Sequence, residues 1–97
     1  MNDINFLGSL ESVIQDRLQN PPAGSYTASL VAAGSKRIAQ KVGEEGVELA
    51  LASVAGDRDE ILNEASDLVY HLLVLLNSHG VCLADVTAVL QARHKQS

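Results

Sequence analysis

Five carboxylates are concentrated in one stretch of the chain, and their spacing could place a metal ion. They form two sets, Glu44, Glu45 and Glu48, and then Glu64 and Asp67. Residues three or four positions apart lie on one face of a helix, so each set predicts a cluster of carboxylates on a helix face. With no cysteine or obvious histidine partner close by, such oxygens favour a hard cation, Mg²⁺ or alternatively Mn²⁺.

A short turn between the two sets determines whether they meet. Gly56 has the place of a helix C′ residue, and Asp57 that of the next N-cap. Two helices joined by so short a turn fold back antiparallel, which brings Glu45 and Glu48 opposite Glu64 and Asp67. Facing carboxylates repel unless a cation lies between them, so the stretch predicts a divalent metal site.

Mg²⁺ in proteins typically bridges carboxylates to substrate phosphates, which indicates phosphoryl or nucleotidyl chemistry with a metal-oriented water as nucleophile. Lys41 lies beside the acidic cluster, where it could reach phosphate oxygens. Neither a GxxxxGK[ST] loop nor a GxGxxG motif is present, and a di-iron bundle would need two Glu-x-x-His pairs that this chain lacks.

Other interpretations of these residues stay open. An acidic face on a helix is most often simply solvated. Gly43 and Gly46 cost a helix about 1 kcal/mol each relative to Ala, so either a partner helix or ligand approaches closely there or the glycines are merely tolerated. His71, four residues after Asp67, is either a core histidine or a substrate contact.

The elements that must position these residues are helices, and the expected fold class is an all-α bundle of about four helices. The first helix spans Asn5 to about Gln19 and stops at Pro21 and Pro22. The second runs from an N-cap at Ser35 to about Ala55, the third from Asp57 to about His79, and the fourth starts at a Cys82 cap with Asp85 three residues on. Propensity does not decide whether the segment Ser25 to Leu30 is helix or loop.

The 97 residues predict a single domain, 1–97. A formal net charge of −5, without a basic tract or an aromatic run, argues against nucleic-acid binding. The richest apolar run, Leu68 to Leu76, is far shorter than the roughly 20 residues that span a bilayer, and the N-terminus has no secretory pattern. One cysteine, Cys82, fits a reducing cytosol, so we expect a cytoplasmic protein without a membrane partner. Because the Leu68 to Leu76 run is apolar nearly all round, we expect a homodimer or higher homo-oligomer to complete the bundle.

Three segments together resemble a known family. The runs Lys41–Glu48 (KVGEEGVE) and Glu64–Leu73 (EASDLVYHLL) resemble the EExxE…ExxD signature of the all-α nucleoside triphosphate pyrophosphohydrolases. With Ser25-Tyr26-Thr27 upstream, the resemblance narrows to the phosphoribosyl-ATP pyrophosphatases of the second step of histidine biosynthesis, and it covers roughly Leu7 to Arg93. Gly46 stands where the family more often has Ala, and Cys82 where a Ser cap is usual.

The resemblance implies Mg²⁺-dependent hydrolysis of phosphoribosyl-ATP to phosphoribosyl-AMP and pyrophosphate. It implies four metal ligands, a residue that orients or deprotonates the attacking water (Glu44, in a role exchangeable with Glu45), cations that neutralise the departing pyrophosphate and further substrate contacts. The ligands are Glu45, Glu48, Glu64 and Asp67, the cations are Lys36 and Lys41, and the substrate contacts are Tyr26, Thr27 and His71. A housecleaning pyrophosphohydrolase of non-standard nucleotides and a non-catalytic helical interaction module are the alternatives.

Overall fold

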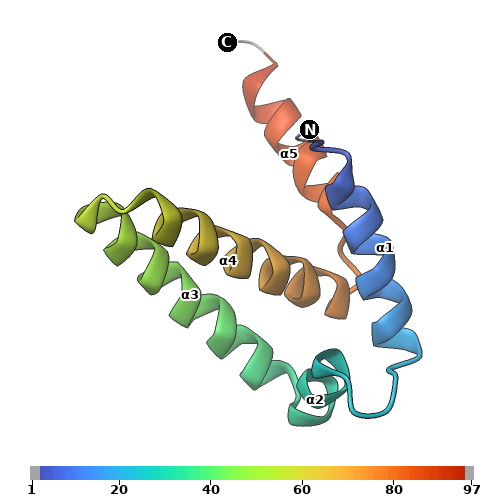
Figure 1. Cartoon of the computed structure of the whole chain (residues 1–97). Helices are drawn as coiled ribbons and strands as arrows, with labels where there is room; N and C mark the ends of the chain where they lie inside the picture. Colours follow the sequence, from blue (N-terminus) through green and yellow to red (C-terminus); the bar gives the residue numbers. More distant parts are fainter. Residues whose placement is uncertain (1–2, 96–97) are drawn as a thin grey trace.

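A computed structural model describes residues 3–95, which fold into five α-helices without a strand (Figure 1). The helices are α1 (Phe6–Gln19), α2 (Tyr26–Ala33), α3 (Ser35–Ala55), α4 (Arg58–Ser78) and α5 (Leu83–His94). The all-α class is confirmed. There is one helix more than the expected four because the undecided segment after the prolines is helical.

The long helices α3 and α4 form an antiparallel hairpin and lie side by side along most of their length (Figure 1). Gly56 ends α3 in the left-handed conformation with φ +76°, which glycine adopts at little steric cost. Asp57 then caps α4, because its Oδ1 accepts hydrogen bonds from the backbone N–H groups of Asp59 and Glu60. The predicted turn is confirmed.

The other end of α3 differs slightly from the expectation. Ser35 is the first residue of the helix and not its cap, and Gly34 precedes it with φ +91°. Gly34 also ends α2, so the two helices meet at a single residue. That conformation disfavours any residue with a Cβ, which explains why the helix boundary falls on the glycine.

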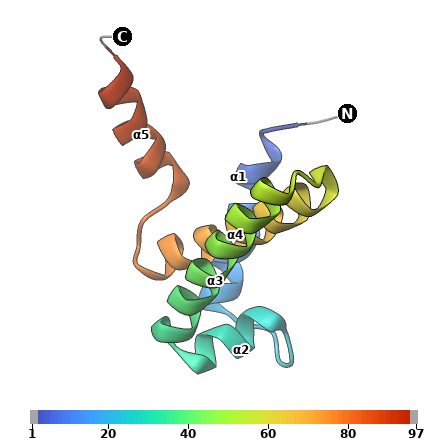
Figure 2. The same cartoon turned by 90° about the vertical axis from the view of Figure 1, so that its left-hand side faces the viewer.

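Helices α1 and α2 pack against the open end of the hairpin, where the core lies (Figures 1 and 2). The buried hydrophobic cluster takes one residue from each of α1, α2 and α3 and two from α4: Ile14, Leu30, Ile38, Leu73 and Val74. Every residue from Leu68 to Leu76 is buried or half-buried within this single chain. The run expected to make an oligomer interface is therefore largely covered by the chain itself.

Helix α2 is short, and its stability comes from its cap and its buried face. The Ser25 hydroxyl accepts a hydrogen bond from the backbone N–H of Ala28 at 2.9 Å. Thr27 and Leu30 are both buried. An isolated helix of this length is only marginally stable in water, so packing against the other helices supplies the stability that helix propensity does not.

Helix α5 projects away from the hairpin, and none of its residues is buried (Figure 2). Its expected start is confirmed: Cys82 is the N-cap, and the Asp85 carboxylate accepts hydrogen bonds from the backbone N–H and the thiol of Cys82. These two hydrogen bonds, the backbone one contributing more, lower the pKa of Asp85. Glu11 fixes the same corner, because its Oε2 accepts hydrogen bonds from Leu83 N at 2.7 Å and Asn77 Nδ2 at 2.9 Å.

Within residues 3–95, no helix taken singly has both the length and the apolar character needed to cross a bilayer. Only α4 and α5 together would pass by length and composition, and they are bent at 101° to each other.

Candidate functional site

The hairpin brings the predicted carboxylates of α3 and α4 into mutual electrostatic range around Glu64. The pKa of Glu64 is raised, first by a side-chain hydrogen bond with Glu48, then by burial, and then by the charges of Glu48, Asp67 and Glu45. Like charges disfavour ionisation of a neighbouring carboxyl group. The juxtaposition expected from the two spacings is thus present, and it carries the expected repulsion.

The side chains of this group interact with one another but do not form a ready-made cation site. The interaction with Glu48 raises the pKa of Glu64 and so favours its protonated form. Among residues 3–95, no three Asp, Glu, His or Cys side chains are grouped closely enough to hold a metal ion. The side chains must therefore rearrange for a cation to be held by three or more of them.

The donor chemistry nevertheless fits a hard divalent cation. Within the described part of the chain, Oε1 of Glu45 and Oε2 of Glu64 are buried without a hydrogen-bond partner. A buried carboxylate oxygen without a partner is costly, and a cation would remove that cost. Because every candidate ligand is a carboxylate oxygen, the residues present fit Mg²⁺ or Mn²⁺.

A cavity of about 450 Å³ lies beside Glu48 and Glu64, toward the turn of the hairpin. Glu60 and Asn63 also line it, and neither is among the residues predicted for the site. The signal was available, because Glu60 precedes Glu64 by four positions and so continues the acidic face of α4.

Glu45 is the most enclosed of the carboxylates, with 4% of its surface exposed. Its Oε1 lies 2.5 Å from Nδ1 of His71, and its Oε2 lies 3.9 Å from Nζ of Lys41. The contact with His71 has the separation of an ion pair but not the direction of a hydrogen bond, so Oε1 stays without a hydrogen-bond partner. Nδ1 of His71 makes its hydrogen bond with the Asp67 carbonyl oxygen, at 2.9 Å.

The predicted substrate contacts at the start of α2 face the hairpin. The Tyr26 hydroxyl lies 2.5 Å from Nε2 of His71, while its residue is 49% exposed overall. Thr27 is buried, and its hydroxyl is hydrogen-bonded to that of Tyr70 at 3.2 Å. Burial raises the pKa of Tyr26, an effect that the Lys41 charge partly opposes. Of this group, Tyr26 alone presents a large exposed surface to a ligand.

The remaining predicted residues lie on the exposed side of α3. Glu44 pairs with Arg37 at 3.4 Å, and both side chains are about half exposed. Lys36 is exposed in the first turn of the helix. Glu44 therefore points along a different face from Glu45, as expected for residues separated by about 100°.

The glycines beside the acidic set contact nothing within this chain. A Cβ added at Gly43 or Gly46 would have no atom of residues 3–95 outside its own helix within 4 Å. Close approach by another part of the same chain is thus not the reason for these glycines. A ligand, a second chain or simple tolerance remain as explanations.

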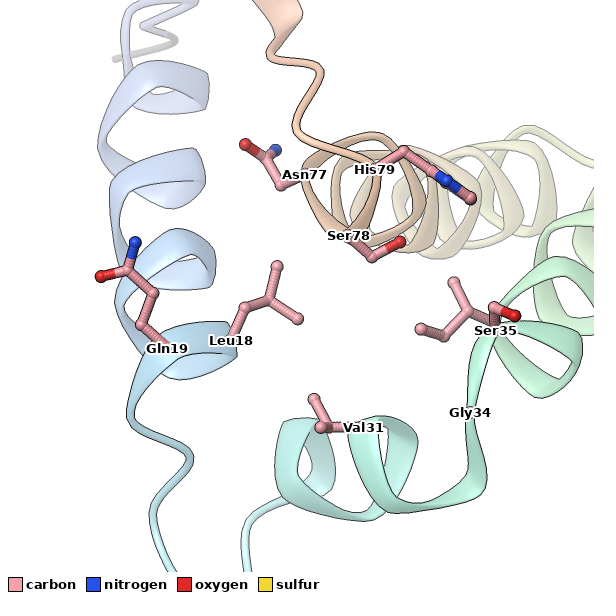
Figure 3. Close-up of a pocket in the computed structure, with 9 residues that line it drawn as sticks. Leu18, Gln19, Val31, Gly34, Ser35, Asn77, Ser78 and His79 are labelled. Atoms are coloured by element: carbon pink, nitrogen blue, oxygen red, sulfur yellow. The ribbon is translucent and has the colours of Figure 1, made fainter.

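A second cavity, of about 360 Å³, lies at the other end of the molecule, between α1, α2, the start of α3 and the end of α4. Figure 3 shows Leu18 of α1 and Val31 of α2 extending toward the end of α4, with Ser35 and His79 at the edge. No carboxylate lines this cavity. It is therefore separate from the acidic group.

Comparison with known proteins gives a consistent result. The family model described as phosphoribosyl-ATP pyrophosphohydrolase matches residues 7–94. The chain is similar to histidine biosynthesis bifunctional proteins HisIE. It is 56% identical to that of Shewanella oneidensis over 92 residues, which are 95% of this chain and 44% of the relative. It is 54% identical to that of Yersinia pestis over 95 residues, which are 98% of this chain and 47% of the relative.

The chain thus spans less than half the length of these curated relatives. The family match, in contrast, extends from the first turn of α1 to the end of α5 and includes the whole acidic hairpin. On this evidence the chain belongs to the phosphoribosyl-ATP pyrophosphohydrolase family.

Proposed function

We propose that this chain hydrolyses phosphoribosyl-ATP to phosphoribosyl-AMP and pyrophosphate, with Mg²⁺ held by the acidic hairpin. The family match and the relatives named for histidine biosynthesis support the substrate and the reaction. The observation that carries the proposal is the group of carboxylates around Glu64, which raise its pKa through a hydrogen bond and repulsion.

Glu45, Glu48, Glu64 and Asp67 would hold the metal. Bound there, Mg²⁺ would supply positive charge to the phosphate oxygens and promote attack by water. Carboxyl groups that disfavour one another's ionisation, and two buried oxygens without hydrogen-bond partners, would both be stabilised by a bound cation.

The other residues would act on water and on the leaving group. Glu44 would orient or deprotonate the attacking water, while its pairing with Arg37 leaves it accessible to solvent. Water would attack the phosphorus that remains on phosphoribosyl-AMP, and the bond to pyrophosphate would break. Lys36 and Lys41 would neutralise the charge that develops on pyrophosphate, and Tyr26 would contact the substrate through its exposed ring.

The proposal includes a cytoplasmic homo-oligomer. Apolar side chains on the outer face of α3 support the oligomer, because Val47, Leu51 and Val54 are each more than 60% exposed. Contiguous exposed apolar surface on a helix is typical of an interface.

The direct test is pyrophosphate release from phosphoribosyl-ATP, compared with ordinary and modified nucleoside triphosphates, with and without Mg²⁺. We expect release from phosphoribosyl-ATP only, and only with the metal. Preference for modified triphosphates would indicate a housecleaning pyrophosphohydrolase. The absence of pyrophosphate release from all of these substrates would instead indicate a non-catalytic helical interaction module, with the acidic face as part of it.

A further inference from the structure

Several contacts within the protein hold the His71 ring in place, more than a residue that only contacts a substrate would need. The ring is buried, with 6% exposed, and both of its nitrogens are engaged by the protein. Tyr26 and Tyr70 contact the ring at 83° and 85° to its plane, with centroids 5.6 and 5.3 Å away. Edge-on contacts from two tyrosine rings restrict the orientation of the imidazole.

The surroundings of the ring determine which nitrogen carries the proton. Nδ1 faces the Asp67 carbonyl at 2.9 Å and Glu45 Oε1 at 2.5 Å, and both of these groups can only accept. Nδ1 must therefore carry a hydrogen. In the neutral ring Nε2 is then an acceptor, and the Tyr26 hydroxyl, 2.5 Å away, donates to it.

We propose that Tyr26 and His71 form a positioning unit for Glu45, in which the Tyr26 hydroxyl anchors the imidazole at Nε2 and the Nδ1 edge of the ring, 2.5 Å from Oε1, keeps the Glu45 carboxylate in place for the metal. The inference rests on the proposed role of Glu45 as a metal ligand. Partners behind a metal ligand orient it, and their loss typically weakens metal binding by about 10- to 100-fold.

The chain offers a matched control for this role. The hydroxyls of Tyr26 and Tyr70 both join α2 to α4. The Tyr70 hydroxyl, however, is hydrogen-bonded to Thr27 and not to a nitrogen of the His71 ring that contacts Glu45. Tyr26→Phe and Tyr70→Phe each remove one such hydroxyl and keep the ring. Only the first removes the hydrogen bond that anchors the His71 ring at Nε2.

The experiment measures Mn²⁺ binding to the substrate-free protein by electron paramagnetic resonance, with melting curves to show that each variant is folded. We expect Tyr26→Phe to raise the Kd for Mn²⁺ about tenfold or more, and Tyr70→Phe to change it less than about twofold. His71→Asn has no atom at the position of Nε2 for the Tyr26 hydroxyl to hold, so adding Tyr26→Phe to it should cause no further loss.

Equal Mn²⁺ affinities in the two tyrosine variants would overturn the inference, since the Tyr26 hydroxyl would then only dock α2. A higher KM for phosphoribosyl-ATP in Tyr26→Phe with unchanged Mn²⁺ affinity would also overturn it and make the hydroxyl a substrate contact. If the wild-type protein binds no Mn²⁺, the proposed metal site itself fails, a result distinct from the other two.

Discussion

At the scale of single residues, Glu64 shows what the metal-free site costs the fold. Its pKa in the folded chain is raised above the ordinary value of 4.5, chiefly by the hydrogen bond with Glu48. A carboxyl group with a raised folded pKa stabilises the fold fully below its unfolded pKa, and this contribution is lost as the pH rises through the folded value.

We therefore predict that Glu64→Gln changes how stability depends on pH. In the presence of a chelator, the melting temperature of the wild type should fall relative to that of Glu64→Gln as the pH rises from about 4 to 8. Mg²⁺ should reverse the deficit in the wild type, because a ligand of the native state stabilises it. A difference in melting temperature that is constant across this pH range would contradict the account.

The cluster of carboxylates could be predicted from the sequence because the residues that indicate it lie close together in the chain. Positions three and four apart share a helix face, and a glycine and an aspartate fix the turn between the sets. The anchoring of His71 by Tyr26 had no such signal, because the two residues lie 45 positions apart in the chain. That partner becomes visible only when α2 is placed on the hairpin.

At the scale of elements, Glu11 joins three helices through one carboxylate oxygen. It accepts hydrogen bonds from the side chain of Asn77 in α4 and from the first backbone N–H of α5, at Leu83. Sequence analysis could not identify this residue, since its partners lie 66 and 72 residues away. The start of α5 was predictable from Cys82 and Asp85, but its attachment to α1 was not.

Replacing Glu11 should loosen this corner of the molecule. We predict that Glu11→Ala lowers the free energy of unfolding by about 1–3 kcal/mol, the usual cost of losing hydrogen bonds to a charged group. Urea denaturation provides the measurement, and hydrogen exchange should show the first amides of α5 less protected. Gln15→Ala, one turn further along α1, removes only an exposed contact with Asn77 and should cost less. Equal losses in both variants would contradict the proposed role of Glu11.

The short helix α2 shows the limit of sequence patterns for elements. Its eight residues have no clear apolar face, so periodicity left the segment undecided. The helix is stabilised by the burial of Thr27 and Leu30 against other helices and by the Ser25 cap. Such contacts depend on the whole fold and not on the local sequence.

At the scale of the whole molecule, the expectation of an oligomer came from the apolar run of α4. In the structure α1, α2 and α3 cover much of that run, whereas Val47, Leu51 and Val54 on α3 stay exposed. Their spacing of four and three residues places them on one face of the helix. We expect any oligomer to use this face.

A charge on this face should separate the subunits. We predict that Val54→Lys, at a position 87% exposed in the single chain, shifts the sedimentation coefficient toward that of a monomer. Ser53→Lys adds the same charge one residue earlier, about 100° around the helix, and should leave the assembly intact. If Val54→Lys leaves the oligomer intact, this face is not the interface. If the wild type is a monomer at micromolar concentration, the expectation of an oligomer is wrong.

The central claim is that the acidic hairpin is a metal-dependent active site, and the most direct test is turnover of phosphoribosyl-ATP across a Mg²⁺ titration. Glu48→Gln, as the loss of a ligand, should need more Mg²⁺ and recover part of its rate at high metal. Glu44→Gln should keep the Mg²⁺ dependence of the wild type while its rate falls by roughly 10²- to 10⁴-fold, the usual contribution of a general base. Wild-type rates in both variants would contradict the claim, because the hairpin would then not be the site of the reaction.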